Sequence, residues 1–116
     1  GWTIRQVVHH LADSHLNAFV RLHLALTEEA PTIKPYLEAK WAQLPDYNLP
    51  IESSLDILRG VHLRWAHLLK SMQPVDFQRT FVHPQYGKVY SLDTMTALYV
   101  WHGEHHLGHI WLVVED

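Results

Sequence analysis

The segment TIRQVVHHLADSHLNAFVRLHLAL (residues 3–26) predicts one long amphipathic helix. Thr3 is suited to be the N-cap, and Gln6 stands three positions later, which is the spacing of a capping box. Pro31 ends the pattern, which gives a helix of roughly 26 residues, about 39 Å long. Apolar residues recur through the segment at helical spacing: Ile4, Val7, Val8, Leu11, Ala12, Phe19, Leu22 and Leu26.

Two further segments show the same periodicity. One begins near Ser53 or Ser54 and ends before Pro74, and the other is capped by Ser91 and continues from Leu92 to about Val114. Three amphipathic helices of similar length predict an all-α fold, an up-and-down four-helix bundle in a single domain over residues 1–116. Their apolar faces are broad for three helices. We therefore expect a fourth helix from a missing N-terminal segment or from a second chain.

The connecting segments differ in character. Residues 31–50 contain four prolines, and connections of this length in compact domains are usually functional or disordered. Their apolar residues favour a packed cover over a flexible linker: Ile33, Tyr36, Trp41 and Tyr47. Residues 77–92 combine β-favouring residues with the Tyr86–Gly87 turn, so the pattern allows either a small hairpin or an irregular loop.

The composition excludes several classes of protein. The 116 residues include no cysteine, which excludes disulfides, thiolate zinc sites and a cysteine nucleophile. The net charge of −3 makes nucleic acid an unexpected partner, and no apolar run is long enough to cross a membrane. We see no signal peptide and expect a cytoplasmic protein. The chain begins at Gly1 rather than at a methionine, which suggests an N-terminally truncated fragment.

Eleven histidines are the unusual feature, and four of them fall within VWHGEHHLGHI (residues 100–110). His102 and His106 are four positions apart and lie inside the apolar stripe of the predicted last helix, whereas Glu104 and His105 point further out. Two imidazoles at this spacing can converge on one metal ion at about 2.0–2.1 Å. A third ligand must then come from another helix.

The first helix offers candidates in HHLADSH (residues 9–15). Periodicity places His15 in the apolar stripe, His10 on its flank, and His9 pointing more outward. Spacing alone leaves His10 and His15 equally favoured as the third ligand, with Asp13 behind them. His62 on the next helix also faces the apolar side, although a lone histidine there is more often a core residue bonded to a backbone carbonyl.

WTIRQVVHHLADSH (residues 2–15) and LYVWHGEHHLGHI (residues 98–110) together resemble the YfiT-like branch of the DinB-like superfamily. TEEAPTIKPY (27–36), HLRWAHLL (62–69) and the His-Pro pair at 83–84 extend the resemblance over nearly the whole chain. It implies a four-helix bundle, with a further helix before residue 1, that holds one divalent ion, Zn²⁺ or Ni²⁺. The family's metal ligands fall on His10, His102 and His106.

These expectations lead to three hypotheses of function. The first is a metal-dependent hydrolase in which the three-histidine site activates water for attack on a small molecule. The second is a thiol S-transferase that uses a low-molecular-weight thiol of the bacillithiol type, and the third is a non-catalytic metal-binding or dimerisation module. His62 or His15 would orient a ligand or accept a proton. We also expect a homodimer. Four aromatic residues suit either a wall around the site or the core of the bundle: Tyr36, Trp41, Trp65 and Tyr99.

Overall fold

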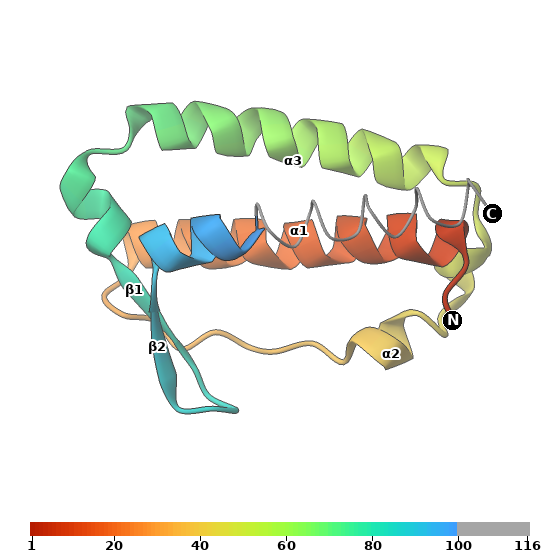
Figure 1. Ribbon diagram of the computed structural model, residues 1–116, viewed down its shortest axis with the longest axis horizontal. Helices are drawn as coiled ribbons and strands as arrows, with labels where there is room; N and C mark the ends of the chain where they lie inside the picture. The colour runs from red at the N-terminus through yellow and green to blue at the C-terminus, as the bar shows by residue number, and fades with distance from the viewer. Residues whose placement is uncertain (100–116) are drawn as a thin grey trace.

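The computed structural model describes residues 1–99, so His102 and His106 lie outside the described residues. Two long helices dominate (Figure 1). The elements in chain order are α1 (Ile4–Thr27), α2 (Glu38–Trp41), the 3-10 turn η1 (Pro45–Asn48), α3 (Glu52–Ser71), the 3-10 turn η2 (Pro74–Gln78), β1 (Thr80–His83) and β2 (Lys88–Ser91). A further helix begins at Leu92 and is described through Tyr99.

The start of α1 is fixed by the predicted capping box. The Thr3 hydroxyl accepts a hydrogen bond from the Gln6 backbone N–H at 3.2 Å. The Gln6 side-chain oxygen accepts one from the Thr3 backbone N–H at 2.9 Å. Both N–H groups would otherwise lack a partner at the first turn of a helix, so the sequence signal and its physical cause agree.

The helical bundle is confirmed, but its helices do not simply alternate in direction. In Figure 1, α1 and α3 run in the same direction, because residues 28–51 carry the chain back along the length of α1. Side-chain contacts agree with this parallel arrangement, since His9 bonds Ser54 and His15 bonds His62. The helix that begins at Leu92 runs opposite to α1 (Figure 1).

The main core lies at the end of the bundle where α1 and α3 terminate. Leu22 of α1 and Leu92 at the start of the last helix are fully buried there. Burying this apolar surface is the main stabilising contribution to the fold. The buried cluster consists of Ala18, Leu22, Ala25, Ile33, Val61, Trp65, Phe81, Leu92 and Met95.

Residues 80–91 form the small hairpin that the sequence allowed within residues 77–92. β1 and β2 pair antiparallel, with Thr80 opposite Ser91 and His83 opposite Lys88. Gly87 has a φ of 58°, a conformation that suits glycine at a tight turn. This hairpin is the exception to the expected all-α fold within residues 1–99.

The proline-rich segment packs as a cover, as predicted, at two of its four apolar residues. Ile33 is buried, and its N–H donates to the Val82 carbonyl at 3.0 Å, which fastens the segment to β1. Tyr47 is buried against α1. Trp41 is 38% exposed, so the cover is partial at α2. Among residues 1–99, no helix combines the length and apolar character needed to span a bilayer.

Candidate metal centre and adjoining cavity

His9 has a structural role that the sequence did not reveal. Its Nδ1 lies 2.5 Å from the Ser54 hydroxyl, and its Nε2 lies 2.8 Å from the Leu49 carbonyl oxygen. The ring is 4% exposed, so the prediction that His9 points outward was wrong. The return of residues 28–51 brings Leu49 and Ser54 over this side of α1. With both ring nitrogens engaged, His9 is poorly suited to bind a metal ion.

His10 is buried to the same degree on another face of α1. It is 4% exposed, and its ring meets that of Trp2 edge-on with 4.9 Å between centroids. Residues four and eleven positions further along a helix return to nearly the same face. His10 therefore shares one face of α1 with Ser14 and Arg21.

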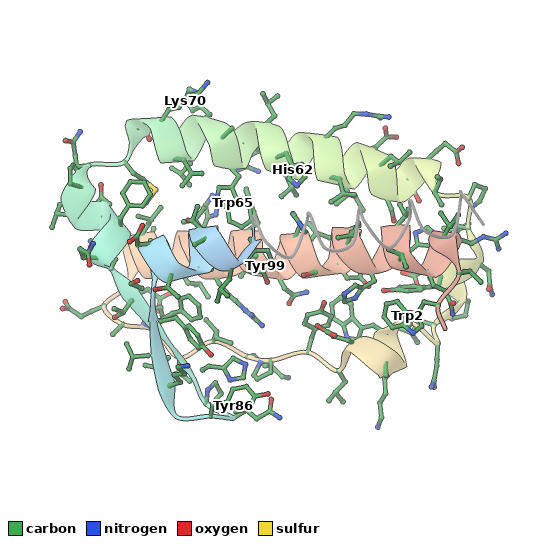
Figure 2. The ribbon with its side chains drawn as sticks, viewed as in Figure 1. Trp2, His62, Trp65, Lys70, Tyr86 and Tyr99 are labelled. Atoms are coloured by element: carbon green, nitrogen blue, oxygen red, sulfur yellow. The ribbon has the colours of Figure 1, made fainter. Side chains whose placement is uncertain are left out.

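His15 and His62 join the two long helices. His62 Nε2 lies 2.8 Å from His15 Nδ1, and one of these nitrogens donates to the other. His15 is buried, and the ring of Tyr99 meets it edge-on at 5.6 Å. Figure 2 shows His62 and Trp65 on the side of α3 that faces α1. His62 is nevertheless an exposed residue, and its partner is an imidazole, so its expected bond to a backbone carbonyl was wrong.

Asp13 holds the proline-rich segment (residues 31–50) to α1, in addition to lying near His9 and His10. The Tyr47 hydroxyl donates to Asp13 Oδ2 at 2.6 Å. Burial raises the pKa of Asp13 above its usual value, while this hydrogen bond and the nearby His10 and His9 act in the opposite direction. Burial also raises the pKa of Tyr47, so its hydroxyl stays protonated as a donor.

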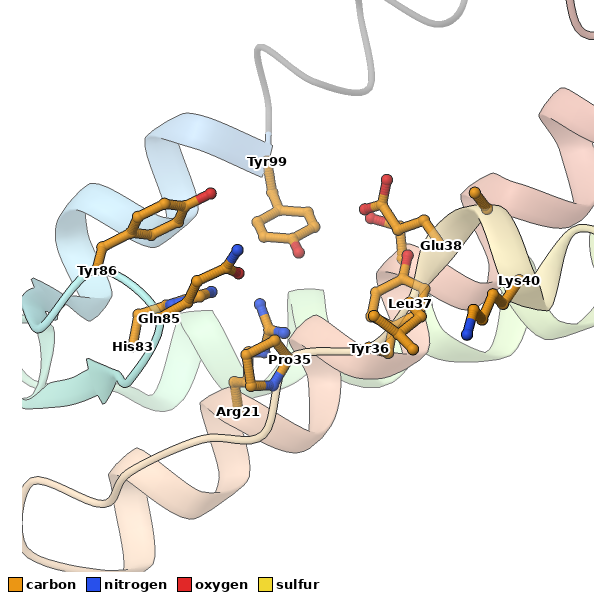
Figure 3. Close-up of a pocket in the computed structure, with 12 residues that line it drawn as sticks. Arg21, Pro35, Tyr36, Leu37, Glu38, Lys40, His83, Gln85, Tyr86 and Tyr99 are labelled. Carbon is orange, nitrogen blue, oxygen red and sulfur yellow. The ribbon is translucent and has the colours of Figure 1, made fainter.

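A cavity of about 570 Å³ lies beside the face of α1 that carries Ser14 and Arg21 (Figure 3). Its walls come from α1, the segment around Tyr36, the turn of the hairpin and Tyr99. Such a volume suits a small-molecule ligand. The residues that line it are Ser14, Arg21, Pro35, Tyr36, Leu37, Glu38, Ala39, Lys40, His83, Gln85, Tyr86 and Tyr99.

Sequence reasoning found only part of this wall. Tyr36 and Tyr99 line the cavity as expected, but Trp65 belongs to the buried core. Trp41 instead lines a neighbouring groove and packs against Tyr36 with 4.7 Å between ring centroids. Arg21 was missed, although its position eleven residues after His10 already placed both on one helix face.

The predicted metal ligands are only partly covered by the structure. Within residues 1–99, no group of three or more histidine, cysteine or acidic side chains is arranged to hold an ion. His10 lies in this part of the chain, and His102 and His106 lie outside it. The donors that the chain offers, imidazoles at helical spacing, suit zinc or nickel chemically.

Comparison with known proteins places the chain in a family. Residues 1–110 match the profile of the DinB superfamily. A relative from Oceanobacillus iheyensis is 57% identical over 110 residues, and one from Bacillus mycoides is 54% identical. Both are named as candidate metal-dependent hydrolases, and in both cases the match covers 95% of this chain and 63% of the relative. The chain thus spans less than two thirds of the curated relatives that it matches.

A solved structure shares the fold. YfiT from Bacillus subtilis, described as a probable metal-dependent hydrolase with an unusual four-helix bundle topology, superposes with a TM-score of 0.96 at 45% identity. The superposition covers 99% of this chain and 66% of that one. With the profile match over residues 1–110 and the identity to these relatives, it shows that this chain belongs to the DinB superfamily.

Proposed function

We propose that this protein is a metal-dependent hydrolase in which His10, His102 and His106 hold one divalent ion, zinc or nickel. The names of its relatives and of YfiT support the general class. An ion bound by three neutral imidazoles keeps its full charge and an open coordination position, so it can lower the pKa of a water molecule toward about 7.

The observation that carries the proposal is the place of His10 on the face of α1 that leads to the cavity. His9 has both ring nitrogens engaged by Ser54 and Leu49. His10 is buried on the face of α1 that continues into the cavity through Ser14. If His10 is a metal ligand, it would hold the ion where a small molecule in the cavity can reach it.

The assignment of His102 and His106 rests on the sequence alone. The two histidines are four positions apart, the spacing at which imidazoles on one helix can share an ion, and the resemblance to the family puts ligands at both positions. The described part of the last helix ends at Tyr99, whose ring meets that of His15 with 5.6 Å between centroids.

The His15–His62 pair is placed to handle a proton. His15 is buried beside Tyr99, which lines the cavity, whereas His62 is exposed on α3. We propose that a proton released at the site is taken up at a ring nitrogen of His15 and passed through the 2.8 Å bond to His62, which delivers it to solvent. This proposal gives both residues the supporting role that the sequence analysis suggested.

Metal analysis tests the ligand assignment. Purified wild-type protein should carry about one zinc or nickel ion per chain by plasma mass spectrometry. His10→Ala, His102→Ala and His106→Ala should each lose it, and His67→Ala, a change at an exposed histidine of α3, should retain it. Loss of metal in His15→Ala with retention in His10→Ala would show that the assignment of His10 is wrong.

The reaction class needs a separate assay. We expect hydrolysis of an activated ester such as p-nitrophenyl acetate to depend on added metal and to fall at least tenfold in the three ligand variants. Conjugation of a small thiol to an electrophile by the metal-loaded protein, without ester hydrolysis, would favour the thiol transferase instead.

A further inference from the structure

We propose that the cavity beside α1 binds a small molecule through a carboxylate group, with Arg21 as the residue that recognises it. This inference rests on the proposed function, since it assigns a substrate class to the same site. Arg21 comes from α1 and points into the cavity (Figure 3). Ser14, two turns before Arg21 on α1, lines the same cavity.

The guanidinium of Arg21 is available for a ligand. Among the described residues, the single ion pair joins Arg59 to Asp56 on the surface of α3, so Arg21 has no carboxylate partner there. Arg21 is half-buried rather than fully solvated. A guanidinium presents a planar set of donors that matches a carboxylate with two parallel hydrogen bonds.

The remaining charges of the wall favour an anion. Lys40 adds a second positive charge to the cavity, and Glu38 is the one acidic residue among those that line it. Figure 3 shows Glu38 on the far side of the cavity from His83 and Gln85. The charged side chains of the described wall thus sum to one positive charge when His83 is neutral, so an anion is favoured over a cation.

Neutral donors line the same cavity as Arg21. Tyr36, Tyr86 and Tyr99 all line the cavity, and burial raises the pKa of Tyr36, which keeps its hydroxyl protonated. His83 Nδ1 is shielded from solvent and has no hydrogen-bond partner within residues 1–99. Tyrosine hydroxyls on the wall can donate to an anion in the cavity, as the guanidinium of Arg21 can.

The separation of Arg21 and His10 along α1 also limits the length and shape of the bound molecule. Arg21 and His10 are eleven residues apart, about 16 Å along the helix axis, and the length of the arginine side chain shortens this separation. A molecule held at Arg21 by its carboxylate would present its other end toward Ser14 and His10. The expected substrate is therefore a small acid whose reactive group is remote from the carboxylate.

A matched pair of probes tests the proposal. 4-Fluorobenzoate and 4-fluorobenzamide have the same shape and differ in charge, and their binding can be followed by fluorine NMR. Wild-type protein should bind the benzoate at least tenfold more tightly than the amide. Arg21→Gln should weaken benzoate binding about 10- to 100-fold, the range expected for hydrogen bonds to a charged group. Arg59→Gln, which removes an exposed arginine, should leave it unchanged.

The titrations should be made on metal-loaded protein and repeated after chelation, because a carboxylate can also bind an ion directly. Arg21→Gln should retain the metal, and the loss of benzoate binding should persist in both preparations. Arg21→Lys, which keeps the charge but not the paired donors, should lie between the wild type and Arg21→Gln. Equal benzoate binding by Arg21→Gln and wild type, or no preference for benzoate over the amide, would overturn the proposal. Absence of bound metal would count against the proposed hydrolase alone.

Discussion

The 2.8 Å contact between His15 Nδ1 and His62 Nε2 is a direct polar link between the two long helices of the bundle. It joins a buried residue of α1 to an exposed residue of α3. One imidazole must donate the hydrogen bond and the other must accept it. The link therefore requires that one of the two nitrogens carries a proton and the other does not. We expect this hydrogen bond to make a measurable contribution to the free energy of unfolding.

Removal of His62 should therefore destabilise the fold. His62→Ala takes away the partner of a buried nitrogen, and we expect the free energy of unfolding to fall by about 1–3 kcal/mol. Urea denaturation followed by circular dichroism measures the change. His67→Ala on the same helix makes the same substitution at an exposed histidine and should change stability by less than about 0.5 kcal/mol. Equal effects of the two substitutions would show that the link contributes nothing.

Changes at His9 and His10 should separate stability from metal binding. His9→Leu removes two hydrogen bonds that hold α3 and the preceding turn to α1, so we expect a loss of about 2–3 kcal/mol. The variant should still bind metal at a temperature at which it is folded. His10→Ala should lose the metal even at a temperature at which the variant is folded. Calorimetry combined with metal analysis distinguishes the two patterns.

The hydrogen bond from Tyr47 should be visible in the titration of Asp13. Burial raises the pKa of Asp13, and the Tyr47 hydroxyl opposes that shift because it stabilises the carboxylate. Tyr47→Phe should therefore raise the pKa of Asp13 further, as measured by the carbon-13 shift of its carboxyl group. An unchanged or lower pKa would contradict the role assigned to the bond.

The same shift predicts the direction of a pH effect on stability. The pKa of Asp13 is higher in the folded protein than in the unfolded chain, so the folded protein binds this proton more tightly. The stability that Asp13 contributes is therefore complete below pH 3.8 and is lost as the pH rises through the folded-state pKa. Asp13→Asn removes the titrating group and should make the fall shallower. Thermal unfolding at a series of pH values tests this, and an identical pH profile in the variant would contradict it.

Two glycines should respond to alanine in opposite ways. Gly60 lies within α3, and a Cβ there would meet no atom within 4 Å, so Gly60→Ala should stabilise the protein by about 0.5–1 kcal/mol. Gly87 has equal space but a φ of +58°, so Gly87→Ala should destabilise it by about 1–2 kcal/mol. Chemical denaturation of both variants checks the sign, and destabilisation by Gly60→Ala would show that α3 depends on a contact not seen here.

The sequence by itself determined the features that depend on near neighbours. The capping box at Thr3 and Gln6 and the helical periodicity after it fixed α1, because their interactions span three or four residues. The same pattern located α3 and the start of the helix at Leu92. It left the hairpin undecided, since short β-favouring pieces around a turn suit a loop as well.

Only the tertiary structure decided which groups His9 bonds. His9 is engaged by Leu49 and Ser54, which are 40 and 45 positions away, and no local pattern reports such partners. They meet His9 because residues 28–51 return along α1 and set α3 parallel to it. The same path brings Tyr36, His83 and Arg21 to one cavity. Helical spacing fixes the face on which a side chain lies, whereas its partners depend on how distant segments pack against that face.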